Sequence, residues 1–272
     1  MRGMLLTIGL LNLPALANAQ QGFAYTWAKG DTATYKTRQA TTVVEAIIEK
    51  KDTLPKTVTT TTDIATTKVW TVTSSDDKGA ALELKITALK QDVEQTVGDA
   101  PANKRQLDSA KPDDAKEMPF LNTPSFRAVL DRTGEVLSLG QDAKTEIGRV
   151  KAEPPFRLIL PKKPVVANDT WKRTITVKTA SGESYDAEQT YTLKGQKDDF
   201  VVVALTTKLM KPPDDNAVLP MLMPMLWEGE LFLNAKSNRY HGARLKVNQE
   251  VNNHRGEGTK FRYSSEYTEA AE

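Results

Sequence analysis

The chain has 272 residues, of which 39% are hydrophobic and 26% charged, a composition typical of a folded protein with a buried core. Its 37 Lys and Arg residues nearly balance 35 Asp and Glu residues, which disfavours a general nucleic-acid-binding protein because such a protein needs a strongly basic face. There is no Cys and there are only two His, which excludes disulfide bonds, thiolate metal sites, a lipid-modified N-terminal Cys and a centre built from several histidines.

The N-terminus has the order of a secretory signal peptide. Arg2 precedes a mostly apolar run over residues 4–16, and Ala17-Asn18-Ala19 places small residues where a signal peptidase binds. The run is shorter than the roughly 20 residues that a stable transmembrane anchor needs. We expect cleavage between Ala19 and Gln20 and a soluble periplasmic or secreted protein of residues 20–272, with a short membrane-dipping segment as the alternative.

Alternation of apolar and polar residues predicts β-strands along the rest of the chain. The pattern is present at residues 82–88, 170–177 and 243–251, and it indicates strands with one buried face and one solvated face. Residues 131–134 form a predicted turn between strands at 126–130 and 135–139.

Two segments depart from this pattern. Residues 200–205 are apolar throughout, which predicts a central strand covered on both faces. Ala143, Ile147 and Val150 have helical spacing, and Glu153-Pro154-Pro155 would end that helix, so one short helix is expected over residues 143–150.

Four pairs of segments resemble each other in the same order. They are residues 29–35 and 167–173, 70–86 and 191–207, 111–115 and 211–217, and 126–139 and 231–247. The pairs predict an internal duplication, with similar halves at about residues 24–140 and 160–268 inside one β-rich domain. The alternative is coincidence, because Asp, Pro and Gly are common in all turns.

The same blocks resemble a family of uncharacterised exported bacterial proteins. The resemblance is carried by Leu130-Asp131-Arg132-Thr133-Gly134 and by Ala167-Asn168-Asp169-Thr170-Trp171, with Asn168 where Gly is usual in the family. It covers most of the mature chain and implies a domain of unknown function with no activity assigned to any residue. A long curved sheet in an exported protein is also similar, in architecture only, to the half-barrel lipoprotein carriers of the cell envelope.

No motif for catalysis or metal binding stands out. His241 and His254 are interpreted as exposed turn residues, since neither has a local nucleophile or a metal-ligand spacing. Ser181 lies in no nucleophile-elbow motif and is interpreted as part of the turn between two strands. The pairs Asp113-Asp114 and Asp214-Asp215 follow Pro and would suit calcium, but Asp is also ordinary in turns, and we expect no metal and no cofactor.

The most unusual stretch is residues 217–227, an apolar run broken by Pro220 and Pro224. Its methionines would suit a packed core, the lining of an apolar ligand site or a copper(I) site, the last being disfavoured because no His lies nearby. The ligand-lining candidates are Met221, Leu222, Met223, Met225, Leu226 and Trp227.

These observations predict an all-β protein with little helix, built as a long, curved, mostly antiparallel sheet that is half-barrel or sandwich-like. The expected function is non-enzymatic: binding of an apolar ligand or an envelope protein on the concave face of the sheet, without nucleic acid and without a transmembrane anchor after signal removal. The alternatives are a structural or interaction protein with a packed core and no pocket and, third, an enzyme.

Overall fold

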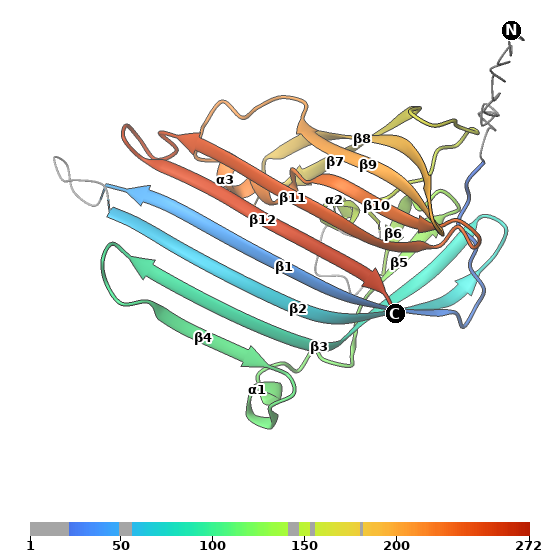
Figure 1. Cartoon of the computed structure of the whole chain (residues 1–272), viewed down its shortest axis with the longest axis horizontal. Helices are drawn as coiled ribbons and strands as arrows, with labels where there is room; N and C mark the ends of the chain where they lie inside the picture. The colour runs from blue at the N-terminus through green and yellow to red at the C-terminus, as the bar shows by residue number, and fades with distance from the viewer. Residues whose placement is uncertain (1–21, 49–55, 141–146, 153–155, 180–181) are drawn as a thin grey trace, which may run out of the picture.

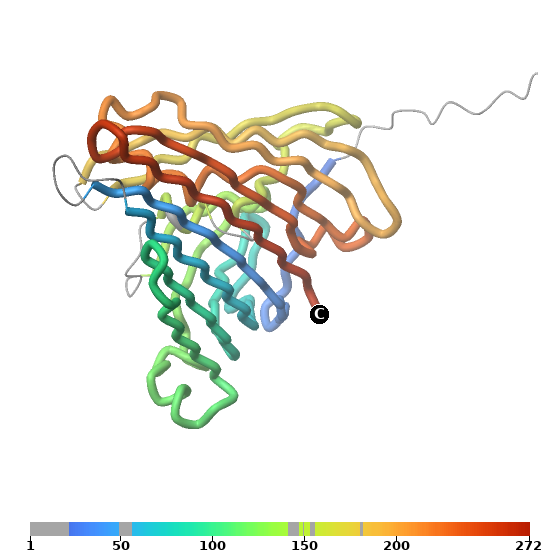
Figure 2. The backbone as a smooth tube through the Cα atoms, turned by 60° about the vertical axis from the view of Figure 1, so that its left-hand side comes forward, coloured from blue at the N-terminus to red at the C-terminus, as the bar shows by residue number. Residues whose placement is uncertain are grey.

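The strands form one antiparallel sheet in the computed structural model, which describes residues 22–48, 56–140, 147–152, 156–179 and 182–272. In the described part of the chain the sheet has 12 strands, in the order β6-β5-β3-β2-β1-β12-β11-β10-β9-β8-β7, with β4 paired to β3 beside this path. Figure 1 shows the sheet bent around α2 and α3, and Figure 2 shows the loop that carries α1 standing away from it. The predicted all-β, curved antiparallel fold is confirmed.

The first three strands are the longest of the described strands. The elements of the first part of the chain are β1 (Thr32–Ile47), β2 (Lys56–Ser75), β3 (Gly79–Val97), β4 (Asn103–Asp108), α1 (Pro112–Lys116), β5 (Pro124–Asp131), β6 (Val136–Leu139) and α2 (Ile147–Lys151). The later elements are β7 (Thr170–Lys178), β8 (Ser184–Lys197), β9 (Phe200–Leu209), α3 (Leu219–Leu222), the 3₁₀ helix η1 (Met223–Met225), β10 (Glu228–Asn234), β11 (Tyr240–Asn252) and β12 (Lys260–Ala271).

Alternation determines which face of each strand is buried. In β11, Ala243, Leu245, Val247 and Val251 are buried, as their spacing predicts. In β9, which lies between β8 and β10, Val201, Val203 and Leu205 are buried on one face and Val202 on the other. Phe200 and Ala204, on the same face as Val202, stay half-exposed. The expectation that residues 200–205 are covered on both faces is therefore wrong in part, because no layer buries these two outward side chains fully.

The core lies on the concave side of the sheet. Segments that are not strands fill it. Residues 156–160 contribute Phe156, Leu158 and Leu160. The helix η1 contributes Met223, and the chain just after η1 contributes Trp227. The helix η1 contacts β11 and β12, while α2 contacts the two edge strands β6 and β7. The interior is therefore occupied at its centre by the connections between strands.

The two parts of the chain form two meanders of the same connectivity. Strands β1, β2, β3, β5 and β6 pair in succession, and so do β7, β8, β9, β10 and β11, with β12 between β1 and β11. Trp70 pairs with Leu84 and the register then shifts after Val72, while Tyr191 pairs with Leu205 and the register shifts after Leu193. Corresponding strands thus share direction and irregularity, which is the arrangement that an internal duplication requires.

Some expectations fall on residues without a described structure. The signal peptide, residues 143–146 of the expected helix, its Glu153-Pro154-Pro155 terminator and Ser181 lie outside the described residues. The described part of that helix is α2, Ile147–Lys151. Over the residues that the structure describes, every helix is too short or too polar to cross a membrane.

Candidate functional site

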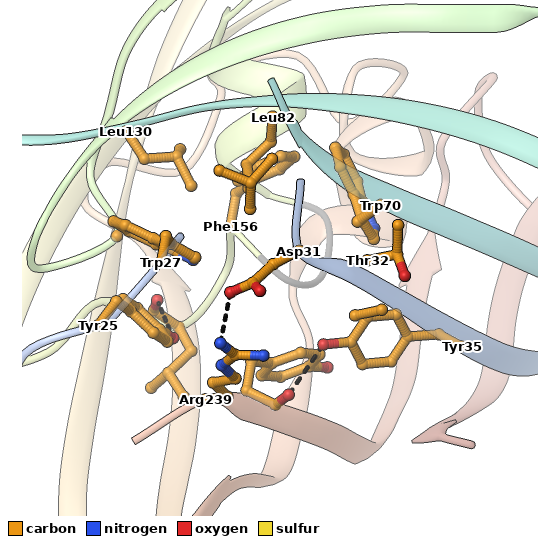
Figure 3. Close-up of a pocket in the computed structure, with 15 residues that line it drawn as sticks. Tyr25, Trp27, Asp31, Thr32, Tyr35, Trp70, Leu82, Leu130, Phe156 and Arg239 are labelled. Carbon is orange, nitrogen blue, oxygen red and sulfur yellow. Dashed lines mark hydrogen bonds and ion pairs between the residues drawn. The ribbon is translucent and has the colours of Figure 1, made fainter. Parts of the chain in front are cut away.

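An aromatic pocket opens on the concave side of the sheet, where β1, β2 and β5 begin or end. It encloses a space of about 70 Å³. Its apolar wall comes from Tyr35 of β1, Trp70 and Val72 of β2, Leu82 of β3, Leu130 of β5 and the core residues Phe156 and Leu158. Figure 3 shows Tyr35, Trp70, Leu82 and Leu130 converging from four strands, with Phe156 between them. The walls suit hydrocarbon or aromatic groups, but the space is smaller than the several hundred Å³ typical of a drug-sized ligand.

The segment of residues 22–28 covers one side of this pocket. Tyr25 and Trp27 line it, and their rings stack with centroids 5.2 Å apart. The backbone nitrogen of Tyr25 donates to the Arg132 carbonyl at 2.9 Å, and Thr26 Oγ1 donates to the Ser237 carbonyl at 3.0 Å. This segment, which we call the N-terminal strap, is therefore hydrogen-bonded to the turns that contain Arg132 and Ser237.

The tyrosines of the pocket are hydrogen-bond donors held in the neutral form. Tyr35 donates to the Tyr240 carbonyl at 2.8 Å, and Tyr25 donates to the Leu158 carbonyl at 3.3 Å. Burial raises the pKa of both phenols, and the nearby charge of Glu269 raises the pKa of Tyr35 further. Their hydroxyl groups are therefore committed to the fold rather than poised for proton transfer near neutral pH.

Asp31 and Arg239 form an ion pair at the rim of the pocket (Figure 3). Asp31 lies just before β1 and also accepts a hydrogen bond from the backbone nitrogen of Ala28 at 3.0 Å. The side chains of Asp31 and Arg239 are 29% and 47% exposed, so water screens their attraction. The rim is thus polar and rearrangeable, while the wall below it is apolar.

The residues proposed from the sequence to line a ligand site lie elsewhere on the concave side. Leu222, Met223 and Trp227 are buried and packed, with the Trp227 ring 6.1 Å from that of Tyr267. Met225 and Leu226 are half-buried, and Met221 is 51% exposed. The structure brings none of the six to the aromatic pocket. The lining role of this stretch stays a prediction.

The two histidines need a correction. His254 is buried, and its Nε2 lies 2.8 Å from Glu45 Oε1 because the β11–β12 tip folds against β1. His241 belongs to β11 and stacks on Phe200 with ring centroids 4.3 Å apart. Neither is the exposed turn residue that the sequence suggested, since long-range pairing decides their surroundings.

The acidic pairs have ordinary structural partners. Asp114 accepts a hydrogen bond from the Asp108 backbone nitrogen at 2.8 Å, and Asp215 accepts one from Ala217 at 2.8 Å. Asp113 and Asp214 face Lys116 and Lys211 across 2.8 Å and 3.6 Å. In the described ranges there is no group of three or more His, Asp or Glu side chains suited to a metal ion.

Two broader hollows have more polar walls. One of about 480 Å³ is lined largely by Thr and charged side chains of β1 to β4, among them Thr42, Asp63 and Glu94. Another of about 520 Å³ combines Phe200, Phe232 and His241 with Lys36 and Arg244. The aromatic pocket is therefore the better match to an apolar ligand.

Sequence analysis missed the aromatic pocket. Tyr25, Trp27 and Tyr35 form an aromatic-rich stretch directly after the expected signal peptide, and this was the available signal. Periodicity assigns Trp70 and Tyr240 to strands, but it does not tell which strands meet. The pocket joins residues that are up to 215 positions apart, from Tyr25 to Tyr240.

Comparison with solved structures finds a protein with a similar fold. A structure described as "Lipid-protein interactions in lipovitellin" aligns with a TM-score of 0.50 and 14% identity, over 91% of this chain and 25% of that chain. The chain thus spans about a quarter of lipovitellin. DynF from the dynemicin biosynthesis pathway of Micromonospora chersina aligns over 96% of this chain and 92% of that chain with 12% identity. Its TM-score of 0.21 is too low for an argument about fold.

Sequence comparison gives a family likeness for the second meander. Among curated proteins, none matches the chain. Residues 156–243, which run from the core segment at Phe156 into β11, match the model of a family of unknown function (DUF6263). The likeness to a domain of unknown function, inferred from the sequence motifs, is thereby confirmed for this stretch of the chain.

Proposed function

We propose that the protein is exported to the cell envelope and binds an apolar ligand on the concave side of its curved sheet, without catalysing a reaction. The observation that carries the proposal is the aromatic pocket, because its wall is apolar and its polar groups lie at the rim. The lipovitellin likeness supports it: that structure is described by its lipid–protein interactions, and the two chains share a sheet architecture. The buried tyrosines support the non-catalytic part, since their hydroxyl groups are engaged by backbone carbonyls.

A structural or interaction protein is the second candidate. Leu222, Met223 and Trp227 fill much of the concave side, as expected where the core serves stability alone. The two functions differ in whether the aromatic pocket takes up a ligand.

A binding experiment with a matched pair of variants separates them. Ala33 lines the pocket and is half-buried, whereas Ala65 lies on β2 and is exposed. We expect saturable micromolar binding of a fluorescent fatty-acyl probe to the wild type and to Ala65→Leu, and binding at least about tenfold weaker to Ala33→Leu because the added carbons occupy the pocket. No saturable binding to the wild type, or equal binding to both variants, would reject the pocket as the ligand site.

A further inference from the structure

We infer that the ligand of the aromatic pocket is a single-chain amphiphile whose head group presents an anionic oxygen, a carboxylate or a phosphate. The inference rests on the proposed function and adds the chemistry of the head group. Two side chains on the pocket wall carry it: Trp70, a buried donor, and Arg239, an exchangeable cation.

Trp70 supplies a buried hydrogen-bond donor that the protein leaves unused. The residue is 5% exposed, and within the described part of the chain its Nε1 has no hydrogen-bond acceptor. Edge contacts with Phe126 and Phe156, at centroid distances of 5.6 Å and 4.9 Å, fix the ring. Figure 3 shows the nitrogen edge of the indole turned toward Thr32 and Tyr35, which also line the pocket.

Trp171 shows the satisfied arrangement of an indole in the same fold. It is the second residue of β7, and its Nε1 donates to the Ile159 carbonyl at 2.8 Å. A buried N–H without an acceptor costs free energy, and a ligand oxygen that accepts from it recovers that cost. The pocket therefore favours a ligand with an oxygen acceptor over a pure hydrocarbon.

Arg239 supplies a positive charge that is able to pair with a ligand. Among the described residues that line the pocket, Arg239 is the one cationic residue and its partner Asp31 the one anionic residue. Their ion pair is partly exposed and therefore weak, so a ligand oxyanion exchanges with Asp31 at small cost. After exchange Asp31 keeps its hydrogen bond from the Ala28 backbone nitrogen.

A cationic head group fits less well. An ammonium group would pair with Asp31 and lie against aromatic rings, an arrangement that is favourable by itself. It has no acceptor for Trp70 Nε1, however, so the buried donor would remain unpaired. An anionic oxygen head supplies the acceptor that Trp70 Nε1 lacks and the negative charge that Arg239 attracts.

The size of the pocket limits how much of the ligand's hydrocarbon chain it holds. A space of about 70 Å³ holds the carbons next to the head group against Leu82, Leu130 and Phe156. The remaining carbons of a longer chain do not fit in this space and extend beyond it. A space of this size holds one chain better than two.

The test measures head-group preference within each protein by isothermal titration calorimetry. The ligands share one alkyl chain: dodecanoate, dodecyl phosphate, dodecanol and dodecyltrimethylammonium. The proteins are the wild type, Trp70→Phe, Arg239→Gln and the control Lys246→Gln, whose side chain is 68% exposed and pairs with Glu228. Because preference is a ratio within one protein, a general loss of stability in a variant does not imitate the expected result.

We expect the wild type and the control to bind the better of the two oxyanions at least about tenfold more tightly than the ammonium ligand. Arg239→Gln should lower the preference for the oxyanions over dodecanol, and Trp70→Phe should weaken all three oxygen-headed ligands relative to the ammonium ligand. The stronger of dodecanoate and dodecyl phosphate distinguishes a free fatty acid from a phosphate head group.

Failure of the proposed function and failure of the head-group inference give different results. Binding of none of the four ligands rejects the proposed function. Binding of all four with equal affinity, or a preference unchanged in both Trp70→Phe and Arg239→Gln, rejects the head-group inference and leaves the proposed function standing.

Discussion

Glu135 and Arg173 lie at opposite edges of the sheet, yet their side chains meet. Glu135 immediately precedes β6 and Arg173 belongs to β7, and Arg173 Nη1 lies 3.3 Å from Glu135 Oε2. Arg173 also donates to Gln189 Oε1 at 3.0 Å and 2.6 Å and to the Lys151 carbonyl at 2.7 Å. Lys151 of α2 pairs with the same Glu135 carboxylate. The two edges of the open sheet are therefore joined by a buried arginine and by α2.

Replacing Arg173 by Met should destabilise the protein strongly. The substitution removes the charge and the hydrogen bonds that Arg173 supplies to Glu135, Gln189 and the Lys151 carbonyl, while Lys151 still pairs with Glu135 and Tyr191 still bonds Gln189. Breaking a buried ionic network in this way costs up to about 3–5 kcal/mol. Urea unfolding measures the loss as a shift of the midpoint. The control is Arg262→Met, whose exposed pair with Glu250 is screened by water, so its loss should change stability little. Similar small losses in both variants would show that the edge contact contributes nothing to the fold.

Two turns in corresponding positions of the meanders should be equally important. Asp131 Oδ1 accepts hydrogen bonds from Thr133 N, Thr133 Oγ1 and Glu135 N. Asn234 Oδ1 accepts them from Lys236 N, Ser237 N and Ser237 Oγ. We expect Asp131→Ala and Asn234→Ala each to lower the free energy of unfolding by about 1–3 kcal/mol.

The control for these turns is Asp99→Ala, an exposed turn residue expected to change stability by less than about 0.5 kcal/mol. Chemical denaturation of the three variants gives the comparison. A large loss in one turn and none in the other would contradict the equivalence of the halves that the internal duplication predicts.

Local features of the fold could be predicted from the sequence, whereas long-range pairing could not. Ala243, Leu245 and Val247 point inward as their alternation indicates, and the turn at residues 131–134 joins β5 to β6. Period-two patterns do not identify a strand's partner, so the pairing of β1 with β12 was not predictable. For the same reason the aromatic pocket could not be predicted. The burial of Arg173 beside Ile175 and Val177 could not be predicted either, because a charged residue is expected to be exposed.

Stability should fall in alkaline solution because several phenols are buried. Burial raises the pKa of Tyr191 to about 12, and burial also raises the pKa of Tyr25 and Tyr240. The folded state thus favours the neutral phenols. The contribution of Tyr191 is complete below the unfolded pKa near 10 and is lost as the pH rises toward about 12. Urea unfolding at increasing pH, with tyrosinate absorbance as a second signal, should show both changes together.

Tyr191→Phe tests the assignment of that effect. The variant loses the hydroxyl group that lies 2.9 Å from Gln189 Oε1, so it should be less stable at neutral pH but lose less stability between pH 10 and 12. An unchanged slope of stability against pH would mean that Tyr191 does not titrate in this range.

Export should remove the first 19 residues. The order of Arg2, the apolar run and Ala17-Asn18-Ala19 predicts that protein purified from the periplasm or the medium begins at Gln20. Intact-mass measurement checks this directly, and a mass that retains residues 1–19 contradicts it. Ala19→Trp should block processing, since the peptidase site takes small side chains, while Gln20→Glu serves as the control at the neighbouring position.

Met221 and Met223 separate a packed core from a ligand lining. They are two residues apart, yet Met223 is 3% exposed and Met221 is 51% exposed. Met223→Asp places a carboxylate among buried apolar side chains and should lower the free energy of unfolding by about 3 kcal/mol or more, whereas Met221→Asp should change it by less than about 0.5 kcal/mol.

If the stretch lines a ligand site, Met223→Asp should also abolish binding of a fluorescent acyl probe under conditions where the variant is still folded. If the stretch only packs the core, the folded fraction of Met223→Asp should bind the probe as the wild type does. A stability of Met223→Asp equal to that of Met221→Asp would contradict both interpretations, because each requires Met223 to lie in an apolar environment.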